Sequence, residues 1–176
     1  MPFSNPQTII ESCHFGMGWH VAEFGVGSGA YTRAILKVIG KEGFVYAVDI
    51  QKNLLNRVLR EANDAGYSNI SIVHGDLEQS SGSKLGTESM DAVVIANLLF
   101  QTKNKNGVVA EARRVLKPKG KVLVVDWSAS FAGIGPREED VISGAETEKL
   151  FTAAGFVAEK TVNAGEHHYG ILFKKG

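Results

Sequence analysis

Hydrophobic side chains alternate along the chain between short, nearly continuous runs and longer stretches with helical spacing. The continuous runs are typical of strands buried on both faces, and they cover 20–24, 43–50, 70–73, 91–96 and 121–127. The stretches between them place apolar side chains every three or four residues and predict helices over 30–39, 53–65 and 108–116. Strands and helices that alternate through short loops indicate a parallel sheet covered on both faces. The pattern therefore predicts an α/β fold, a single Rossmann-like, doubly wound sheet.

Both ends of the chain add to this plan. Asn5-Pro6 is typical of a helix N-cap followed by proline at the first helical position, so a short helix is expected before the first strand. Ser143 and Glu146 have the spacing of a capping box, which predicts a helix ending near Gly155. The segments 156–162 and 169–173 then predict two strands joined by a short polar turn, an antiparallel hairpin at the end of the sheet.

Composition and charge narrow the class of protein. The chain has 176 residues, a length typical of a single domain, and 19 basic against 19 acidic side chains, which favours neither nucleic acid nor an anionic membrane as partner. Cys13 is the sole cysteine, so no intramolecular disulfide can form. No Lys or Arg precedes Arg33, and the longest apolar run, 92–100, is too short to span a bilayer. We expect one cytoplasmic domain over 1–176, a monomer or homodimer.

Glycine is the unusual component, and it gathers where ligands bind in such folds. In open α/β sheets the binding site lies beyond the carboxyl ends of the strands. The first strand is followed there by Gly25, Gly27 and Gly29, which allow a sharp turn and close approach of a ligand to the backbone. The second strand ends at Asp49, twenty residues after Gly29, where a carboxylate can accept both hydroxyls of a ribose. Later strands end at His74-Gly75-Asp76-Leu77, Asn97 and Asp126-Trp127.

Two classes of cofactor are compatible with the glycine loop by itself. Gly25-x-Gly27-x-x-Ala30 satisfies the relaxed dinucleotide fingerprint, so an NAD(P)-binding oxidoreductase is one alternative. Glu23, two residues before Gly25, favours the other, because its carboxylate would oppose a pyrophosphate and suit a cationic amino group.

Several motifs, in the right order, resemble one family. The run VAEFGVGSGAYT is similar to the glycine-rich loop of class I S-adenosylmethionine-dependent methyltransferases, AVDI to their acidic ribose motif and HGDLE to their adenine motif. DAVVIANLLF resembles their fourth strand and RVLKPKGKVLVVDW the turn into the fifth. The resemblance covers roughly 18–175 and is closest to the broad group that includes ubiquinone and menaquinone C-methyltransferases. It implies seven strands in the order 3-2-1-4-5-7-6, the last two forming the C-terminal hairpin.

The resemblance implies S-adenosylmethionine as the cofactor, S-adenosylhomocysteine as its product and no metal. At the methionine end, Gly25, Gly27 and Gly29 would pack on the methionine moiety and ribose. Glu23 would face the amino group, and Asn97 would lie beside the methionine moiety and the transferring methyl.

The adenosine end is assigned in the same way. Asp49 would bind the ribose hydroxyls and Ile50 would lie against the adenine. Asp76 would accept a hydrogen bond from the exocyclic amine, and the backbone N–H of Leu77 would donate to the ring.

The acceptor side carries fewer signals, and its catalytic residues are unknown from sequence. His167 and His168 lie at the tip of the hairpin on the ligand side, as candidates for a catalytic or substrate-binding role or as an ordinary polar turn. Trp127 could form a wall of the substrate site together with His168. A short N-terminal lid over 1–18 and a substrate-side loop over 128–143 would complete it, so that Trp127 and 131–143 partly close the pocket.

Cys13 and His14 lie in that N-terminal segment and cannot form a metal site by themselves, while His20 and His74 are expected to be structural. The basic stretch 103–121 is either a solvated face or a docking patch for a membrane surface or RNA.

Three hypotheses of function remain open at this point. A methyltransferase acting on a small-molecule or lipid-like acceptor is favoured; it needs its nucleophile held about 3 Å from the methyl, and positioning of that kind can supply roughly 7–11 kcal/mol. A protein or RNA methyltransferase is the second, although nucleic acid is disfavoured because no aromatic residues interleave with the basic stretch. The third is the NAD(P)-binding oxidoreductase. A catalytically silent cofactor binder would share the same site.

Overall fold

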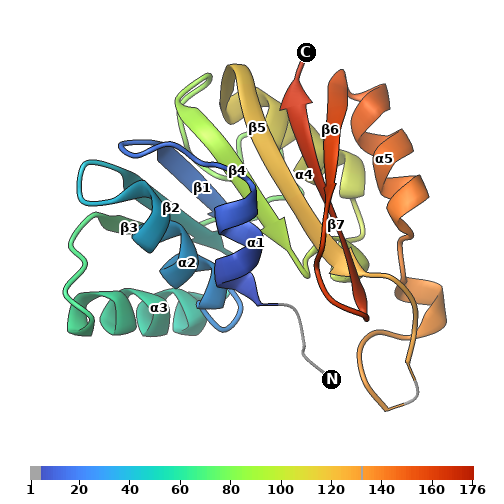
Figure 1. The fold of residues 1–176 in the computed structure, drawn as a ribbon, viewed down its shortest axis with the longest axis horizontal. Helices are drawn as coiled ribbons and strands as arrows, with labels where there is room; N and C mark the ends of the chain where they lie inside the picture. The colour runs from blue at the N-terminus through green and yellow to red at the C-terminus, as the bar shows by residue number, and fades with distance from the viewer. Residues whose placement is uncertain (1–4, 132) are drawn as a thin grey trace.

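Seven strands form one mixed sheet in the computed structural model, which describes residues 5–131 and 133–176 (Figure 1). The strands are β1 (His20–Phe24), β2 (Phe44–Asp49), β3 (Ile70–His74), β4 (Met90–Ala96), β5 (Leu116–Trp127), β6 (Phe156–Val162) and β7 (His168–Lys175). The helices are α1 (Pro6–Ser12), α2 (Ala30–Ile39), α3 (Lys52–Asp64), α4 (Lys105–Val115) and α5 (Gly144–Ala153), with the 3₁₀ turns η1 (Leu99–Gln101) and η2 (Glu138–Asp140).

The strand order is β3-β2-β1-β4-β5-β7-β6, which confirms the predicted fold class and topology. Strands β1 to β5 pair in parallel, whereas β7 is antiparallel to both β5 and β6. The carboxyl ends of the parallel strands and the turn between β6 and β7 consequently lie at one edge of the sheet (Figure 1). This edge carries the candidate site.

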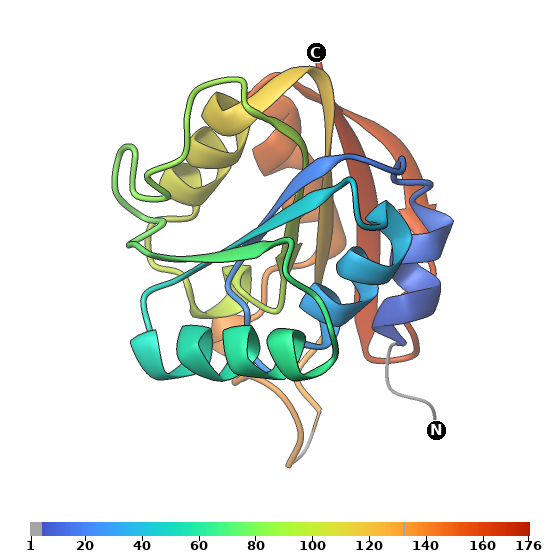
Figure 2. The ribbon, with the colours of Figure 1, turned by 90° about the vertical axis from the view of Figure 1, so that its left-hand side faces the viewer.

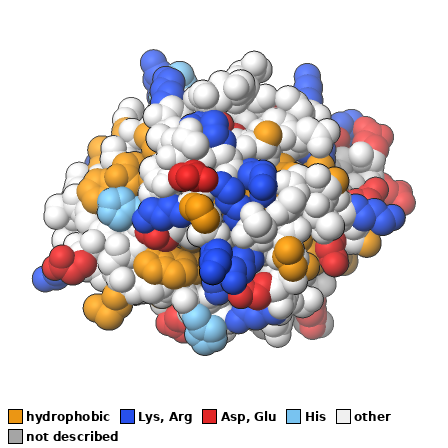
Figure 3. Space-filling view, turned by 90° about the horizontal axis from the view of Figure 1, so that it is seen from above, with side chains coloured by type: hydrophobic (Ala, Val, Ile, Leu, Met, Phe, Trp, Pro, Cys, Tyr) orange, Lys and Arg blue, Asp and Glu red, His pale blue; other side chains and the backbone are white. Residues whose placement is uncertain are grey.

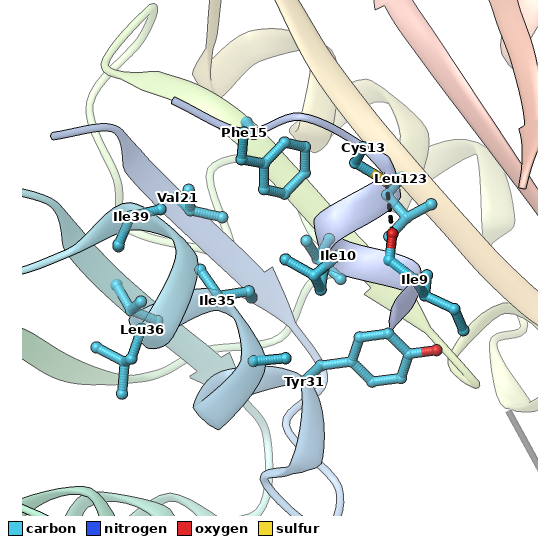
Figure 4. Packing of buried hydrophobic residues seen from close by; sticks show 14 of the residues in the cluster. Ile9, Ile10, Cys13, Phe15, Val21, Tyr31, Ile35, Leu36, Ile39 and Leu123 are labelled. Atoms are coloured by element: carbon cyan, nitrogen blue, oxygen red, sulfur yellow. Dashed lines mark hydrogen bonds between the residues drawn. The ribbon is translucent and has the colours of Figure 1, made fainter. Parts of the chain in front are cut away.

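Helices cover both faces of the sheet because successive apolar side chains of the central strands point to opposite sides. One buried cluster joins α1, α2 and α3 to the sheet, and the other joins α4 and α5 to its opposite face. Ile9 and Ile10 of α1 are almost fully buried and pack beside α2 and Leu123 of β5 (Figure 4). Figure 2 shows the two layers from the side.

Within 5–18, the described part of the segment predicted as a lid over 1–18, the apolar side chains Ile9, Ile10, Cys13 and Phe15 are buried in the core. Asn5 accepts a hydrogen bond from the backbone N–H of Gln7 and so starts α1, as expected. Cys13 is buried, its thiol donates to the carbonyl of Ile9, and burial raises its pKa to about 11, which fits a structural role (Figure 4). Among the described residues of this segment, Pro6 alone lines the site cavity, and residues 1–4 lie outside the described part.

The prediction was wrong at the junction of α4 and β5. Leu116 was placed in the helical stripe and the strand was expected to begin at Lys121, but α4 ends at Val115 and β5 begins at Leu116. Leu116 is extended (φ −74°, ψ 133°), fully buried and paired with Met90. A buried residue four positions after Ala112 fits a helix pattern and a strand start equally well, so periodicity could not separate them. Elsewhere the predicted strand and helix ends match or differ by one or two residues, apart from the start of α4, which was expected at Val108 and lies at Lys105.

A helix that crosses a membrane needs about 20 predominantly apolar residues. Within 5–131 and 133–176, the helices are all too short or too polar to cross a bilayer.

Candidate functional site

A cavity of about 470 Å³ opens at the carboxyl edge of β1 to β4. Strand ends and the loops after them line it, and the lining includes nearly all the residues predicted to hold a cofactor: Glu23, Gly25, Gly27, Asp49, Ile50, Asp76, Leu77 and Asn97. The sheet thus brings together side chains that are up to 74 residues apart in the sequence (97 − 23).

The glycine loop turns sharply from β1 into α2. Gly25 has φ +80° and donates its N–H to the carbonyl of Val48 at 2.8 Å, while a Cβ on it would lie 3.2 Å from Leu98. Gly27 has φ +49° and open space where its Cβ would point. Gly29 differs from the prediction, because it does not line the cavity. It is the N-cap of α2 and leaves room for Val58 of α3.

Asp49 connects the loop to the end of β2. Its side chain is 7% exposed, and its two carboxylate oxygens accept backbone N–H bonds from Val26 at 2.9 Å and Gln51 at 2.8 Å. Each oxygen retains a second lone pair for a ligand hydroxyl. The same carboxylate that was predicted to bind a ribose therefore also holds the glycine loop in place.

Asp76 and Leu77 form the wall opposite the glycine loop. Oδ1 of Asp76 accepts from the N–H of Glu78, and the carbonyl of Asp76 accepts from Gln79, so a compact turn fixes the side chain. Glu78 in turn accepts from the N–H of Asn104, the residue that caps α4. This wall of the cavity is thereby tied to α4.

Replacement of Gly82 by alanine is expected to disturb this wall. A Cβ at Gly82 would lie 1.7 Å from the carbonyl oxygen of Asp76, so backbone must shift. Overpacking of this kind costs roughly 1–3 kcal/mol, which corresponds to a fall of about 3–10 °C in melting temperature at this chain length. Gly86→Ala is the matched control, because its Cβ would meet only Ser89 at 3.6 Å. Thermal unfolding followed by circular dichroism checks both, and equal melting temperatures would contradict the packing described.

Asn97 lies at the end of β4 in the left-handed region, with φ +52°. Asparagine tolerates this conformation better than most residues, and the backbone is held by bonds from the N–H of Asn97 to Val125 and from Gln101 to the carbonyl of Asn97. Its Oδ1 is buried and, among the described residues, has no hydrogen-bond partner. An unsatisfied acceptor in the wall of a cavity is what a donor group of a ligand would complete.

Glu23 is almost fully buried at the floor of the cavity and accepts a hydrogen bond from the hydroxyl of Thr32. Burial raises the pKa of Glu23 to about 8, and the nearby charge of Asp49 adds to the rise. At neutral pH the carboxyl group is thus mostly protonated in the protein without ligand. Without ligand, Glu23 is therefore not the fixed negative charge that the sequence suggested.

The stability of the unliganded protein is expected to fall as the pH rises from 5 to 8. Glu23 has a folded pKa of about 8 against an ordinary value of 4.5, so between these values the folded state holds a proton that the unfolded state has released. Stability then decreases with pH by about 1 kcal/mol per unit, because the unfolded state binds fewer protons. Urea unfolding at pH 5, 6, 7 and 8 measures it. Glu23→Gln should flatten the slope between pH 7 and 8, above the raised pKa of Asp126, which adds to the slope at lower pH. A slope of the same size between pH 7 and 8 in that variant would show that another group causes it.

Asp126 was noted from sequence without a role, and the structure supplies one. Its buried carboxylate accepts backbone N–H bonds from Leu99 at 2.9 Å, Phe100 at 3.4 Å and Trp127 at 2.8 Å. Burial raises the pKa of Asp126 to about 6. Asp126 thereby fixes the η1 turn that follows Asn97. In the sequence, the one indication of this role is that Asp126 is an acidic residue near the end of an apolar strand. Its hydrogen-bond partners could not be predicted from the sequence.

The predicted acceptor-side residues lie at the same edge but outside this cavity. Trp127 and His168 face each other with ring centroids 4.3 Å apart, and Phe131 lies against His167 at 4.2 Å. In the part of the chain that the structure describes, neither these residues nor 131–143 line the cavity, so the expected partial closure is not seen; residue 132 lies outside the described part. Pro6, Tyr31 and Thr102, which sequence reasoning missed, line it instead.

The remaining predicted features are largely structural. The ring of His20 packs against Phe44 and Tyr46, and a ring nitrogen of His74 is hydrogen-bonded to the carbonyl of Ile50 at 3.0 Å. In the basic stretch 103–121, ion pairs or carbonyl bonds engage most side chains, as in Lys117–Asp91 at 2.7 Å and Lys121–Glu159 at 3.1 Å. Figure 3, which views the edge opposite the cavity, shows basic side chains interspersed with acidic ones.

Comparison with known proteins identifies the family. The family model described as "Methyltransferase domain" matches residues 22–124, more than half of the chain. The chain belongs to the S-adenosylmethionine-dependent methyltransferase family. This family match decides against an NAD(P)-binding oxidoreductase, the other class that the glycine loop allowed.

The curated relatives of this methyltransferase chain are named for different reactions. The ubiquinone/menaquinone biosynthesis C-methyltransferase of Hahella chejuensis is 30% identical over 72% of the chain and 50% of its own length. The malonyl-[acyl-carrier protein] O-methyltransferase of Halalkalibacterium halodurans is 33% identical over 66% of the chain and 39% of its own. The chain spans about half the length, or less, of these curated relatives.

A solved methyltransferase structure supports the fold. The crystal structure of an S-adenosylmethionine-dependent methyltransferase from Aquifex aeolicus superposes with a TM-score of 0.89 at 23% identity, covering 99% of this chain and 91% of that one.

The residues present fit the cofactor that the methyltransferase family implies. Asn97 Oδ1 is an acceptor without a donor among residues 5–131 and 133–176, Asp49 has acceptor capacity beside the glycine loop, and exposed Ile50 offers an apolar surface. For a metal the result differs: among the described residues, no three His, Cys, Asp or Glu side chains are grouped to hold an ion.

Proposed function

We propose that the chain is a methyltransferase that binds S-adenosylmethionine in the 470 Å³ cavity and acts on a small-molecule or lipid-like acceptor. The observation that carries the proposal is the placement of Glu23, Asp49, Asp76 and Asn97 around one cavity of a methyltransferase-family fold. Glu23 suits an amino group, Asn97 the methionine end beside the transferring methyl, Asp49 a ribose and Asp76 an adenine.

The chain's own residues would bind and orient. Asp49 would accept from the ribose hydroxyls while its bonds to Val26 and Gln51 keep the loop in shape. Asn97 would accept from a donor at the methionine end, and Asp126 would keep the η1 turn beside it fixed. When bound, S-adenosylmethionine supplies an activated methyl group on a positively charged sulfur, which carries its own leaving group. Transfer of this methyl group requires the protein mainly to hold the acceptor in the correct position beside it.

The acceptor class rests on two observations. The relatives named above are described as acting in quinone biosynthesis and on a malonyl thioester carrier, both small or lipid-like groups. In addition, three of the seven Lys and Arg side chains in the basic stretch 103–121 form ion pairs and two more donate to backbone carbonyls, which leaves less charge for an RNA backbone.

The acceptor class is tested with methyl-tritiated S-adenosylmethionine, the purified chain and a fractionated bacterial extract. We expect enzyme-dependent label in the fraction that dissolves in organic solvent. Label confined to precipitated protein or to RNA would instead establish the alternative acceptor class. Heat-inactivated chain is the control for non-enzymatic transfer.

A further inference from the structure

Four rings gather at the edge of the sheet beside the cavity, and we refer to Trp127, Phe131, His167 and His168 as the aromatic cluster. Trp127 ends β5 and pairs in register with His168, the first residue of β7. The ring centroids of Trp127 and Phe131 are 6.5 Å apart. Gly135 has φ +83° and lies against the indole, where a Cβ would come within 2.7 Å of the ring. The loop is therefore shaped around the Trp127 side chain.

His168 is the member of the aromatic cluster that packing alone does not explain. Its side chain is 9% exposed, and both ring nitrogens are buried without a hydrogen-bond partner among residues 5–131 and 133–176. A neutral imidazole carries one N–H donor and one acceptor. Leaving both unpaired in a protein interior is unfavourable, so a polar ligand group at this position would be stabilising.

The aromatic cluster adjoins the Asn97 end of the cavity. Ala96, which lines the cavity, pairs with Val125, and Trp127 lies two residues further along β5, roughly 7 Å at the rise of a strand. Val125 and Trp127 share one face of β5, the face covered by α1, whose Pro6 also lines the cavity. Figures 1 and 2 place the tip of the β6–β7 hairpin and the N-terminal end of α1 at the same edge.

We propose that the aromatic cluster is the acceptor subsite and that it takes a planar molecule carrying a hydroxyl group, with that hydroxyl bonded to a ring nitrogen of His168. The assignment rests on the proposed function, because the cluster lies near the Asn97 end of the cavity, where the methyl would lie. Trp127 and Phe131 offer flat faces and edges on which a planar ring packs well. Burial, and secondarily the charge of His167, lowers the pKa of His168, so the imidazole is neutral at pH 7 and keeps a lone pair. Access requires a side-chain shift, which is common on binding.

Nuclear magnetic resonance of the chain labelled with ¹³C-histidine tests the proposal, with 4-cyanophenol as the probe. We expect the probe to move the His168 ring signal saturably at pH 7, and His168→Phe to weaken its binding at least fivefold. Benzonitrile, the same ring without the hydroxyl, should bind wild type and His168→Phe alike. Trp127→Leu is a second variant, and it should weaken both probes because it removes the stacking surface.

The proposed function and the acceptor subsite can be tested independently of each other. Titrations are run with and without S-adenosylhomocysteine, whose affinity should agree within about twofold between wild type and His168→Phe because His168 does not line the cavity. If S-adenosylhomocysteine does not bind, the proposed function is contradicted. The response of the His168 ring signal to 4-cyanophenol still tests the acceptor subsite in that case. A His168 signal that 4-cyanophenol leaves unmoved, or equal affinity for it in wild type and His168→Phe, would overturn the subsite.

Discussion

Asp49→Ala is expected to weaken S-adenosylmethionine binding at least tenfold, a loss of about 1.4 kcal/mol or more. Two effects combine. The carboxylate would no longer accept the ribose hydroxyls, and the backbone N–H groups of Val26 and Gln51 would lose their shared acceptor, so the glycine loop would no longer be fixed. Calorimetric titration of the variant measures the affinity.

A matched substitution separates this effect from loss of an acidic side chain in general. Asp64 is exposed at the last position of α3, and Asp64→Ala should bind with unchanged affinity. Asp49→Asn keeps one acceptor oxygen for the loop and should fold more stably than Asp49→Ala while still losing affinity. Wild-type affinity in a cooperatively folded Asp49→Ala protein would contradict the ribose assignment.

The affinity for S-adenosylmethionine should rise with pH by up to tenfold per unit between pH 6 and 8, then level off. Glu23 has a pKa of about 8 without ligand, because burial disfavours its charge. A cationic amino group beside it would favour the charged form, so binding below pH 8 must release a proton. The increase from pH 6 to pH 8 reaches about 50-fold for one titrating carboxyl group, because at pH 8 half of the Glu23 side chains are already charged without ligand. Calorimetry at pH 6, 7 and 8 measures it.

Two controls assign the pH dependence to Glu23. 5′-Methylthioadenosine has the adenosine and sulfur but no amino acid group, so its affinity should be nearly independent of pH over this range. Glu23→Gln should bind S-adenosylmethionine with the same flat profile. The buried Asp126, with its pKa of about 6, does not line the cavity and should affect both ligands alike. A flat profile for wild type would show that Glu23 does not face the amino group.

The topology could be predicted because each strand of the sheet carries its own pattern. The runs at 91–96 and 121–127 are continuous and apolar as central parallel strands require, and the short turn between the last two strands indicates a hairpin. The ligand edge followed from topology alone, since the ends of parallel strands meet at one edge. Glu23, Asp49, Asp76 and Asn97 were placed there by their positions after strands, and they line one cavity.

What could not be predicted depends on contacts between distant segments. The raised pKa of Glu23 results from its burial and from the charge of Asp49, 26 residues away, which no local pattern reveals. The role of Asp126 depends on the backbone N–H groups of Leu99 and Phe100. Similarly, Asn5-Pro6 identified α1 but not its place in the core, because a short amphipathic helix fits a lid or a buried layer equally.

One measurement tests the central claim most directly: parallel calorimetric titration of the purified wild-type chain with S-adenosylmethionine, S-adenosylhomocysteine and NADH. The cavity geometry predicts micromolar, one-to-one binding of the first two and no heat with NADH. Binding of NADH alone would contradict the account, because the glycine loop and Asp49 would then serve a dinucleotide and the roles assigned to Glu23 and Asn97 would be wrong.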